Sequence, residues 1–237
     1  MSGRALVVIP AYNEVTTIGA VLRGLQTAAP EVQRLVVTDG SRDGTAETVR
    51  SSGERQLELV CNVGYGRALQ AGLLYAMRHG YEVVVTIDAD GQHDPNDIPR
   101  LLAELDASNA DMVIGSRFVR DRAYRGPLGR RVGQAAFSLL TRLLMRRRIY
   151  DTTSGLKAMR ASACRAALEG RFLDFHTEVL VRLSMLGFRI IELPIVVRER
   201  SVGQGMYSFM SAVAYPVKTT LFIITGMLDA MLRRRSR

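Results

Sequence analysis

Residues 83–87 of this chain form an unbroken run of β-branched side chains, which is typical of a strand buried on both faces of a parallel sheet. The run leads directly into Asp88 and Asp90, with Gln92 two positions further on. Ligands bind at the carboxyl ends of strands in open α/β sheets, so the sequence predicts a polar site there. Two carboxylates and an amide oxygen are hard donors of the kind that Mg²⁺ or Mn²⁺ prefers. An acidic turn that closes a strand is the alternative interpretation.

Strand and helix patterns alternate along the chain. Strand patterns cover residues 5–9, 35–37, 57–60, 83–87, 111–115, 156–159 and 188–197. Helical patterns cover residues 18–25, 68–79, 97–105 and 174–186, and a further helix is expected to begin near Ala46. We expect Pro10 to end the first strand and Thr16 or Thr17 to cap the first helix. The alternation predicts an α/β fold with a mostly parallel central sheet flanked by helices.

The net charge of +9 on 237 residues, with a pI near 10.1, predicts an anionic partner. Nucleic acid, a phosphorylated substrate and a membrane surface all satisfy this condition. The two cysteines, Cys61 and Cys164, are too far apart for a Cys-x-x-Cys site, which argues against a disulfide framework. The apolar run near the N-terminus is too short for a signal peptide, so we expect cytosolic chemistry.

The segment 118–150 combines positive charge with an apolar helix pattern. Arginines flank that pattern, which covers residues 132–145, and a single acid, Asp121, lies among them. The arginines from the preceding strand end onward are Arg117, Arg120, Arg122, Arg125, Arg130, Arg131, Arg142, Arg146, Arg147 and Arg148. An apolar helix with arginine at both ends predicts a surface that meets anionic lipid head groups. A solvated basic face is the alternative.

The C-terminal tail, residues 206–237, is apolar enough to be considered as a transmembrane span. Pro216 and Lys218 interrupt it, and polar residues recur at helical spacing. A single span would also place the terminal arginines on the outside, against the positive-inside rule. We therefore expect amphipathic, membrane-associated helices that lie in the interface.

Several motifs in this order resemble those of glycosyltransferase family 2, most closely its dolichyl-phosphate mannose synthase-like branch. The resemblance covers roughly residues 5–205. The motifs are Pro10-Ala-Tyr-Asn-Glu14, Asp39-Gly-Ser-Arg-Asp-Gly-Thr45, Asn62-Val-Gly-Tyr-Gly66, Asp88-Ala-Asp-Gly-Gln-His-Asp-Pro95, Ser116-Arg117, Asp151-Thr-Thr-Ser-Gly155 and the loop 198–205. Two positions depart from the family pattern. Thr38 replaces an aspartate, and the loop near Gly203 lacks the usual lysine.

The resemblance implies a GT-A catalytic domain over residues 1–205, in which residues 118–150 face the acceptor and the membrane, followed by the tail 206–237. It implies a nucleoside-diphosphate sugar donor, GDP- or UDP-linked, and Mg²⁺ or Mn²⁺ held by Asp88, Asp90 and Gln92. Asp39 is expected to contact the base. The full set expected around the nucleotide sugar is Pro10, Ala11, Tyr12, Glu14, Asp39, Gly66, Asp88 and Ala89.

The predicted reaction is metal-dependent transfer of the sugar to a polyprenyl phosphate at the cytosolic face of a membrane. The metal site, centred on Asp90, and Arg117 or Arg131 would neutralise the leaving diphosphate. Residues expected to bind the acceptor phosphate are Arg117, Arg130, Arg131 and Arg200. The alternative acceptor is a sugar hydroxyl, which needs a general base, and Asp151 and Glu178 are the candidates.

Other classes of function explain the sequence less well. A nucleic-acid-binding module should interleave its arginines with exposed aromatics, and the basic segment has few. A dinucleotide-binding dehydrogenase needs Gly-x-Gly-x-x-Gly after the first strand, where Pro10-Ala-Tyr-Asn-Glu14 stands instead. A catalytically silent membrane-docking module would have no need of the acidic cluster at residues 88–94. We therefore expect no nucleic-acid partner.

Overall fold

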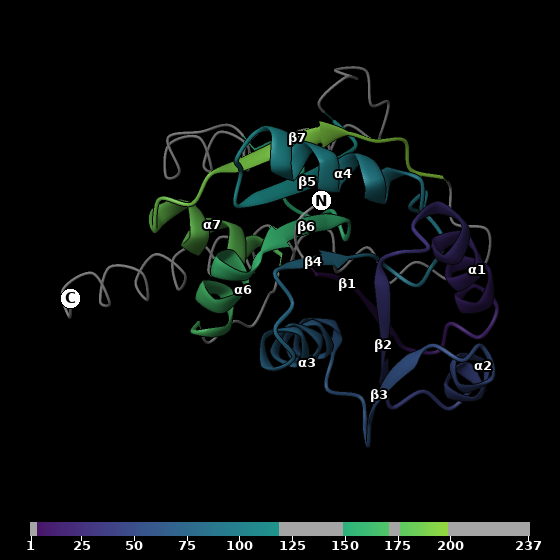
Figure 1. Cartoon of the computed structure of the whole chain (residues 1–237). Helices are drawn as coiled ribbons and strands as arrows, with labels where there is room; N and C mark the ends of the chain where they lie inside the picture. The colour runs from purple at the N-terminus through teal and green to yellow at the C-terminus, as the bar shows by residue number, and fades with distance from the viewer. Residues whose placement is uncertain (1–3, 119–148, 171–175, 199–237) are drawn as a thin grey trace, which may run out of the picture.

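The computed structural model of the protein describes residues 4–118, 149–170 and 176–198 (Figure 1). The strands are β1 (Ala5–Ala11), β2 (Gln33–Asp39), β3 (Arg55–Leu59), β4 (Val83–Thr86), β5 (Met112–Ser116), β6 (Lys157–Arg160) and β7 (Ile190–Pro194). The helices are α1 (Ile18–Ala28), α2 (Thr45–Ser51), α3 (Tyr65–Arg78), α4 (Asp97–Ala107), α6 (Ala161–Leu168) and α7 (Thr177–Met185). The strands form one seven-stranded sheet in the order β3-β2-β1-β4-β6-β5-β7.

Strand β1 lies inside the sheet and pairs in parallel with β2 and β4. All of its residues are buried, and successive side chains enter opposite faces of the sheet. Leu6 and Val8 belong to the core on one face, whereas Val7 and Ile9 belong to the core on the other. Burial on both faces explains why this strand, like the predicted strand at residues 83–87, is a continuous apolar run.

The two faces of the sheet carry different helices, as Figure 1 shows. Helices α3, α6 and α7 contribute to the core on one face. Helices α1, α2 and α4 contribute to the core on the other face. The result is a three-layer arrangement of helices, sheet and helices.

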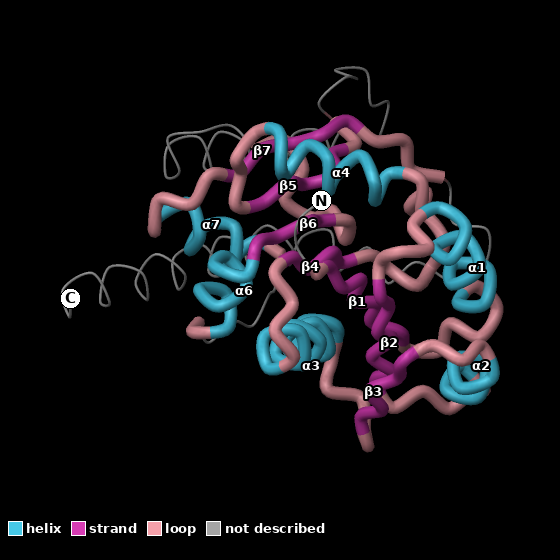
Figure 2. Tube along the Cα trace, viewed as in Figure 1, coloured by secondary structure: helices cyan, strands magenta, loops and turns pink. Residues whose placement is uncertain are grey.

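Strand β6 lies between β4 and β5 in Figure 2. It makes the sheet mixed, because it runs antiparallel to both of these neighbours. The other pairings are parallel. The prediction of a mostly parallel sheet flanked by helices is therefore correct, with one reversed strand. Since β6 begins where β4 ends, the residues that precede β6 lie at the same sheet edge as those that follow β4.

Two local predictions are wrong in detail, and one helix was missed. Pro10 does not end the first strand but pairs with Val37 inside it. The Val8 carbonyl accepts the Ile87 amide and so faces β4. Backbone groups two residues apart in a strand face the same neighbour, so the Pro10 nitrogen, which has no hydrogen, also faces β4. Pairing with β4 therefore ends at Val8. Thr17 is the N-cap residue of α1, but its hydroxyl donates to Glu14 and makes no capping bond. Helix α6 was not predicted.

Several predicted features lie outside the described residues. They include the apolar helix at residues 132–145, most of the segment 118–150, Arg130, Arg131, Arg200 and the tail 206–237. In the part of the chain that the structure describes, every helix is too short or too polar to cross a bilayer.

Candidate active site

Polar residues from five strands meet at one edge of the sheet. Tyr12 follows β1, Asp39 ends β2, Asp88 follows β4 and Arg117 follows β5. The segment 151–155 reaches the same edge because it leads into the antiparallel β6. This is the edge at which open α/β sheets bind ligands. The sequence motifs that are far apart in the chain are thus brought together by the topology.

The loops after β1 and β2 are joined by hydrogen bonds between backbone and side chains. The Asn13 amide donates to Ser41 Oγ at 3.1 Å, and the Arg42 amide donates to Asn13 Oδ1 at 3.0 Å. The Glu14 amide donates to Thr45 Oγ1 at 2.9 Å. These bonds fix the relative position of two motifs expected to surround the nucleotide. Pro10 and Ala11 are buried at the end of β1, whereas Tyr12 is 47% exposed.

Asp39 is only 2% exposed and anchors the loop that leads into α3. Its two carboxylate oxygens accept the backbone amides of Val63 at 2.7 Å and Gly64 at 2.9 Å. The adjacent Gly40 has a φ of +64°, and a Cβ there would lie 2.5 Å from the Asn62 backbone. Asp39 therefore orients the start of α3, where Gly66 lies in the first turn. Its contact with a base remains a prediction.

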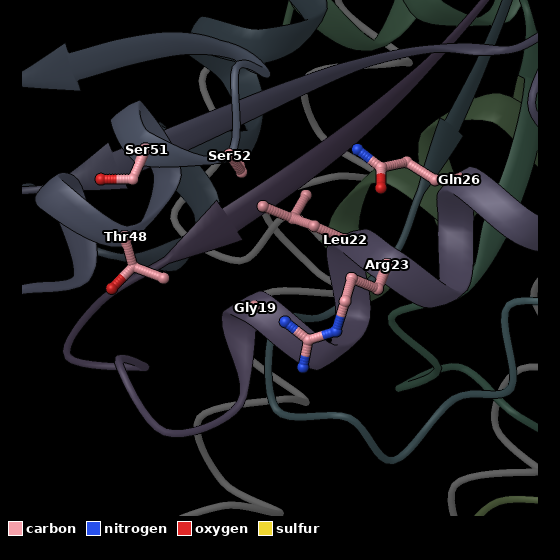
Figure 3. A pocket seen from close by; sticks show the side chains of 7 residues that line it. All are labelled: Gly19, Leu22, Arg23, Gln26, Thr48, Ser51 and Ser52. Carbon is pink, nitrogen blue, oxygen red and sulfur yellow. The ribbon is translucent and has the colours of Figure 1, made fainter.

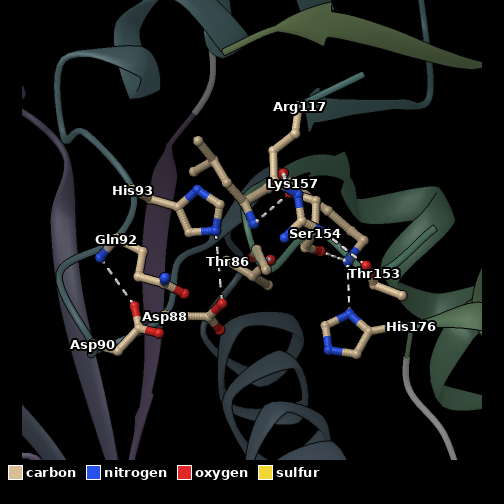
Figure 4. A network of polar contacts seen from close by, with 12 residues as sticks. Thr86, Asp88, Asp90, Gln92, His93, Arg117, Thr153, Ser154, Lys157 and His176 are labelled. Carbon is tan, nitrogen blue, oxygen red and sulfur yellow. Dashed lines mark hydrogen bonds and ion pairs between the residues drawn. The ribbon is translucent and has the colours of Figure 1, made fainter. Parts of the chain in front are cut away.

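Asp88 lies at the centre of a network of polar contacts (Figure 4). Its Oδ1 accepts the Tyr65 hydroxyl at 2.8 Å, and its Oδ2 lies 3.7 Å from His93 Nε2. Burial raises the pKa of Asp88, but the imidazoles of His93 and His176 and the Tyr65 hydroxyl outweigh it and lower the pKa to about 2. Asp88 is therefore a carboxylate at neutral pH.

His93 is 7% exposed and turns one ring nitrogen toward Asp88. Its other ring nitrogen, Nδ1, is buried without a hydrogen-bond partner among the described residues. Because an orphaned buried N–H is rarer than an orphaned lone pair, we place the ring hydrogen on Nε2, facing Asp88. His93 thus presents a donor to the carboxylate.

The carboxylate of Asp88 lies directly against the backbone of Gly155. A Cβ atom on Gly155 would be 1.9 Å from Asp88 Oδ2, far inside the van der Waals contact distance. The Thr86 hydroxyl donates to the Gly155 carbonyl at 2.8 Å and holds this backbone in place. Glycine at position 155 is therefore required by the position of Asp88.

Asp90 and Gln92 follow Asp88 on a loop that is tied to the end of the described chain. Asp90 Oδ1 accepts the Gln92 backbone amide at 3.0 Å. The Gln92 carbonyl accepts the Arg198 amide at 2.9 Å, and Arg198 also forms an ion pair with Asp94 at 3.0 Å. The loop that carries the acidic motif is thus attached to the segment that begins the motif at residues 198–205.

The donor set of Asp88, Asp90 and Gln92 fits a hard divalent cation that keeps part of its hydration. The set consists of two carboxylates and one amide oxygen. Among the described residues there is no group of three or more His, Cys, Asp or Glu side chains that could hold a metal by itself. Mg²⁺ is often bound by one or two carboxylates together with substrate phosphates, and not by a cage made only of protein ligands. The residues present therefore fit a cation shared with a diphosphate. Ala89, between the two aspartates, is buried.

Arg117 is held by Asp151 in a two-pronged ion pair. Its Nε donates to Asp151 Oδ2 and its Nη2 donates to Asp151 Oδ1, both at 2.8 Å. Nη2 also donates to Thr153 Oγ1 at 2.8 Å. Burial raises the pKa of Asp151, but the bonds and charge of Arg117 outweigh it and hold the pKa below its usual range. The pair fixes a guanidinium at the sheet edge.

Glu192 on β7 holds the backbone that carries Asp151. Its carboxylate oxygens accept the backbone amides of Tyr150 and Asp151, each at 2.8 Å. Burial raises the pKa of Glu192, and the nearby Asp151 carboxylate raises it further. Three elements, β5, β7 and the segment before β6, thus cooperate to place Arg117.

Tyr65, Lys157, Glu192, His93 and His176 lie near this edge but are not among the predicted site residues. A signal existed for Lys157 and Glu192, because each interrupts an otherwise apolar strand pattern. Tyr65 belongs to the motif Asn62-Val-Gly-Tyr-Gly66, but it lies 23 positions from Asp88, and no local sequence pattern indicates that the two side chains meet. Glu178 is buried in the first turn of α7.

A separate hollow of about 280 Å³ lies between α1 and α2 (Figure 3). Arg23, Gln26, Thr48 and Ser51 are among the residues that line it. None of the predicted site residues lines this hollow, so it is distinct from the site at the sheet edge.

The family model described as Glycosyl transferase family 2 matches residues 6–168. The chain belongs to this family. The resemblance inferred from the motifs is therefore confirmed, and this family 2 member is an enzyme of the glycosyltransferase class.

The names of several similar proteins refer to lipid phosphates. The undecaprenyl-phosphate mannosyltransferase of Micrococcus luteus is 36% identical, with 86% of this chain and 88% of that protein covered. The polyprenol monophosphomannose synthase of Mycolicibacterium smegmatis is 33% identical, with 95% and 89% covered. The dolichyl-phosphate hexose transferase of Haloferax volcanii is 34% identical, with 82% and 83% covered.

The glycosyltransferase also shares its fold with a solved enzyme. Glucosyl-3-phosphoglycerate synthase from Mycobacterium tuberculosis, in complex with Mn²⁺, uridine diphosphate and phosphoglyceric acid, has a TM-score of 0.71 and 22% identity to this chain. The match covers 93% of this chain and 78% of that one. At this identity the similarity shows a common GT-A-like fold.

Proposed function

We propose that this glycosyltransferase transfers a sugar from a nucleoside-diphosphate sugar to a polyprenyl phosphate at the cytosolic face of a membrane. The observation that carries the proposal is the similarity, over 86% to 95% of the chain, to relatives named for undecaprenyl phosphate and polyprenol monophosphomannose. The acidic motif at the sheet edge is consistent with the donor half of this reaction.

The donor nucleotide is proposed to lie along the loops after β1 and β2. Tyr12, Glu14, Asp39 and the start of α3 border this region. Asp88, Asp90 and Gln92 would hold Mg²⁺ or Mn²⁺ on the diphosphate. The bound cation would neutralise the leaving group as a Lewis acid. The arginine fixed by Asp151 adds a second cation at the same edge, suited to the charge that develops on departure.

A lipid phosphate acceptor agrees with the surroundings of the two base candidates. A phosphate oxygen is already ionised near neutral pH and attacks without losing a proton to the protein. Asp151 uses both carboxylate oxygens to bind Arg117, and Glu178 is 1% exposed. Neither arrangement is that of an open general base. We therefore assign Asp151 a positioning role and propose Arg117, Arg130, Arg131 and Arg200 as acceptor-phosphate ligands.

Peripheral attachment to the membrane is proposed from the sequence of residues 118–150 and 206–237. Both segments combine apolar stretches with arginine clusters. Two such signals are usually needed for stable anchoring to an anionic bilayer. The lipid acceptor would then reach the enzyme from the bilayer surface.

The test is a transfer assay with the full chain in detergent and Mn²⁺, using a panel of labelled GDP- and UDP-sugars. A short-chain polyprenyl phosphate is compared with the matched polyprenol, which differs only in lacking the phosphate. We expect label in the lipid phase with the phosphate acceptor alone. Equal transfer to the polyprenol, or no transfer to the polyprenyl phosphate with any sugar of the panel, would overturn the proposal.

A further inference from the structure

Lys157 is a buried lysine at the start of β6, close to the candidate site. It is 3% exposed, and its ammonium group donates to the Ser154 carbonyl and lies 3.0 Å from His176 Nδ1 (Figure 4). An ammonium has three donors and no acceptor. His176 Nδ1 must therefore accept, and the hydrogen of a neutral imidazole lies on Nε2. Lys157 thus sets the tautomer of His176.

His176 in turn contacts an aromatic side chain from a distant part of the sequence. Its ring stacks on Tyr65, with centroids 4.9 Å apart and planes inclined by 21°. Tyr65 is the first residue of α3, and its hydroxyl donates to Asp88 Oδ1 at 2.8 Å. The contacts therefore run without a break from Lys157 through His176 and Tyr65 to Asp88.

The remaining side of Asp88 is closed by backbone. Gly155 touches the carboxylate directly, as described above, and Thr86 fixes the Gly155 carbonyl. In this environment the Tyr65 hydroxyl selects which way Oδ1 points. With one face confined by backbone, the Tyr65 hydroxyl on Oδ1 and the His93 ring beside Oδ2, the carboxylate has few orientations left.

We propose that Lys157, His176 and Tyr65 are positioning residues that fix the orientation of the Asp88 carboxylate for a divalent cation and the donor diphosphate. This inference rests on the proposed function, since it assigns the three residues to the same site. Groups that hold a metal-binding carboxylate or imidazole from behind affect affinity or activity by about 10- to 100-fold when they are removed. A purely structural role for Lys157 would instead change stability without changing cation binding.

The first measurement needs no metal. Long-range ¹⁵N–¹H spectra of the full chain report the tautomer of each histidine, and His176→Gln identifies the His176 signals. We expect the Nε2–H form for His176, and a change toward a mixture of tautomers in Lys157→Met. His79 serves as an internal reference, because its Nδ1 lies 2.8 Å from the Tyr75 carbonyl and should carry the hydrogen. An Nδ1–H form or a protonated ring for His176 in the wild type would overturn the inference.

The second measurement is the affinity for Mn²⁺ in the presence of UDP or GDP, followed by the electron paramagnetic resonance signal of free Mn²⁺. Tyr65→Phe removes the hydroxyl but keeps the ring against His176. Tyr75→Phe is the matched control, because Tyr75 lies on the same helix and stacks on His79, with centroids 3.9 Å apart. We expect Tyr65→Phe to bind Mn²⁺ about 10- to 100-fold more weakly and Tyr75→Phe to match the wild type.

The two possible failures are distinguishable. Equal Mn²⁺ affinity for Tyr65→Phe and the wild type would overturn the positioning role while leaving the proposed function intact. Failure of the wild type to bind Mn²⁺ with either nucleotide would overturn the metal-dependent function itself. Urea unfolding of both variants shows whether a loss of affinity reflects a loss of fold, and a Tyr65→Phe protein of reduced affinity but wild-type stability supports the inference.

Discussion

Arg117 and Asp151 are 34 positions apart in sequence and share two 2.8 Å hydrogen bonds at the carboxyl edge of the sheet. The Asp151 side chain is fully buried, whereas that of Arg117 is 31% exposed. A planar guanidinium makes two parallel bonds to a carboxylate, which an ammonium cannot do. The pair therefore serves to aim one arginine toward the site.

Arg117→Ala should destabilise the protein by about 3–5 kcal/mol, because it leaves Asp151 buried without its cation. Asp151→Asn should cost less, and the double variant should cost at least about 1 kcal/mol less than the sum of the two. Chemical denaturation of the three variants measures this coupling. The exposed Arg50–Glu58 pair is the control, and Arg50→Ala should cost at most about 1 kcal/mol. Additive effects at Arg117 and Asp151 would contradict the account.

The pH dependence of stability should differ in sign between two neighbouring carboxylates. The folded pKa of Asp151 is lowered below its ordinary value of about 3.9, so its contribution is present above about pH 4 and is lost as the pH falls through the folded pKa. The advantage in unfolding free energy of the wild type over Asp151→Asn should therefore shrink in acid.

Glu192 provides the opposite case. Burial raises its folded pKa above the ordinary value of about 4.3, so its contribution is present at low pH and is lost as the pH rises through the raised pKa. The wild type should therefore lose stability relative to Glu192→Gln as the pH rises from about 4. Urea titrations between about pH 3 and 7 measure both trends. If the difference in unfolding free energy from the wild type changes with pH in the same direction for both variants, the pKa values of these two carboxylates are not shifted in opposite directions.

Gly155→Ala tests the contact between the backbone and Asp88. The new methyl group would lie 1.9 Å from Asp88 Oδ2, so the carboxylate must move. We expect a stability loss of about 1–3 kcal/mol and a fall in transfer of about 100-fold, as for a catalytic group displaced by 1 Å. Gly19→Ala is the matched control, because its Cβ would meet Arg23 at 3.4 Å, and it should stabilise α1 by up to about 1 kcal/mol. Wild-type turnover by Gly155→Ala would refute this role.

Asp90→Ala should remove transfer while leaving the fold intact. Asp90 lies on a loop at the sheet edge, outside the core, and it is a predicted ligand of the cation. We expect a loss of about a thousandfold or more, equivalent to about 4 kcal/mol of transition-state stabilisation. Asp94→Ala is the control on the same loop, because Asp94 pairs with Arg198 and is not a predicted ligand. Full activity of Asp90→Ala, or of the wild type in excess chelator, would exclude the metal role.

Much of the fold was predictable because it is encoded in local patterns. The strand at β4 is a continuous β-branched run, and the loop–helix units after β1, β2 and β3 have their own periodicity. The direction of β6 was not predictable, because it depends on a long connection from β5 whose sequence contains no signal of strand polarity. Local periodicity identifies which face of an element is buried, but not which neighbour it meets.

The same limit explains what was missed at the site. Asp88, Asp90 and Gln92 lie together in sequence, so their proximity was predictable. Asp151 was considered as a general base because nothing near it in sequence indicates its partner, and only the fold brings Arg117 to both of its oxygens. The chain of contacts from Lys157 through His176 and Tyr65 to Asp88 joins four separate segments of the chain, which no sequence window covers.

The most direct test of the proposed reaction is the mass of the lipid product when a polyprenyl phosphate and a glycolipid with free sugar hydroxyls compete in one reaction. The mixture contains the full chain, Mn²⁺ and the nucleotide sugar that supports turnover. We expect a product whose mass equals that of the polyprenyl phosphate plus one anhydro-sugar, with a single phosphorus, and no product in excess chelator. A product built on the glycolipid hydroxyl, or a lipid diphosphate sugar, would contradict transfer of the sugar to the phosphate oxygen.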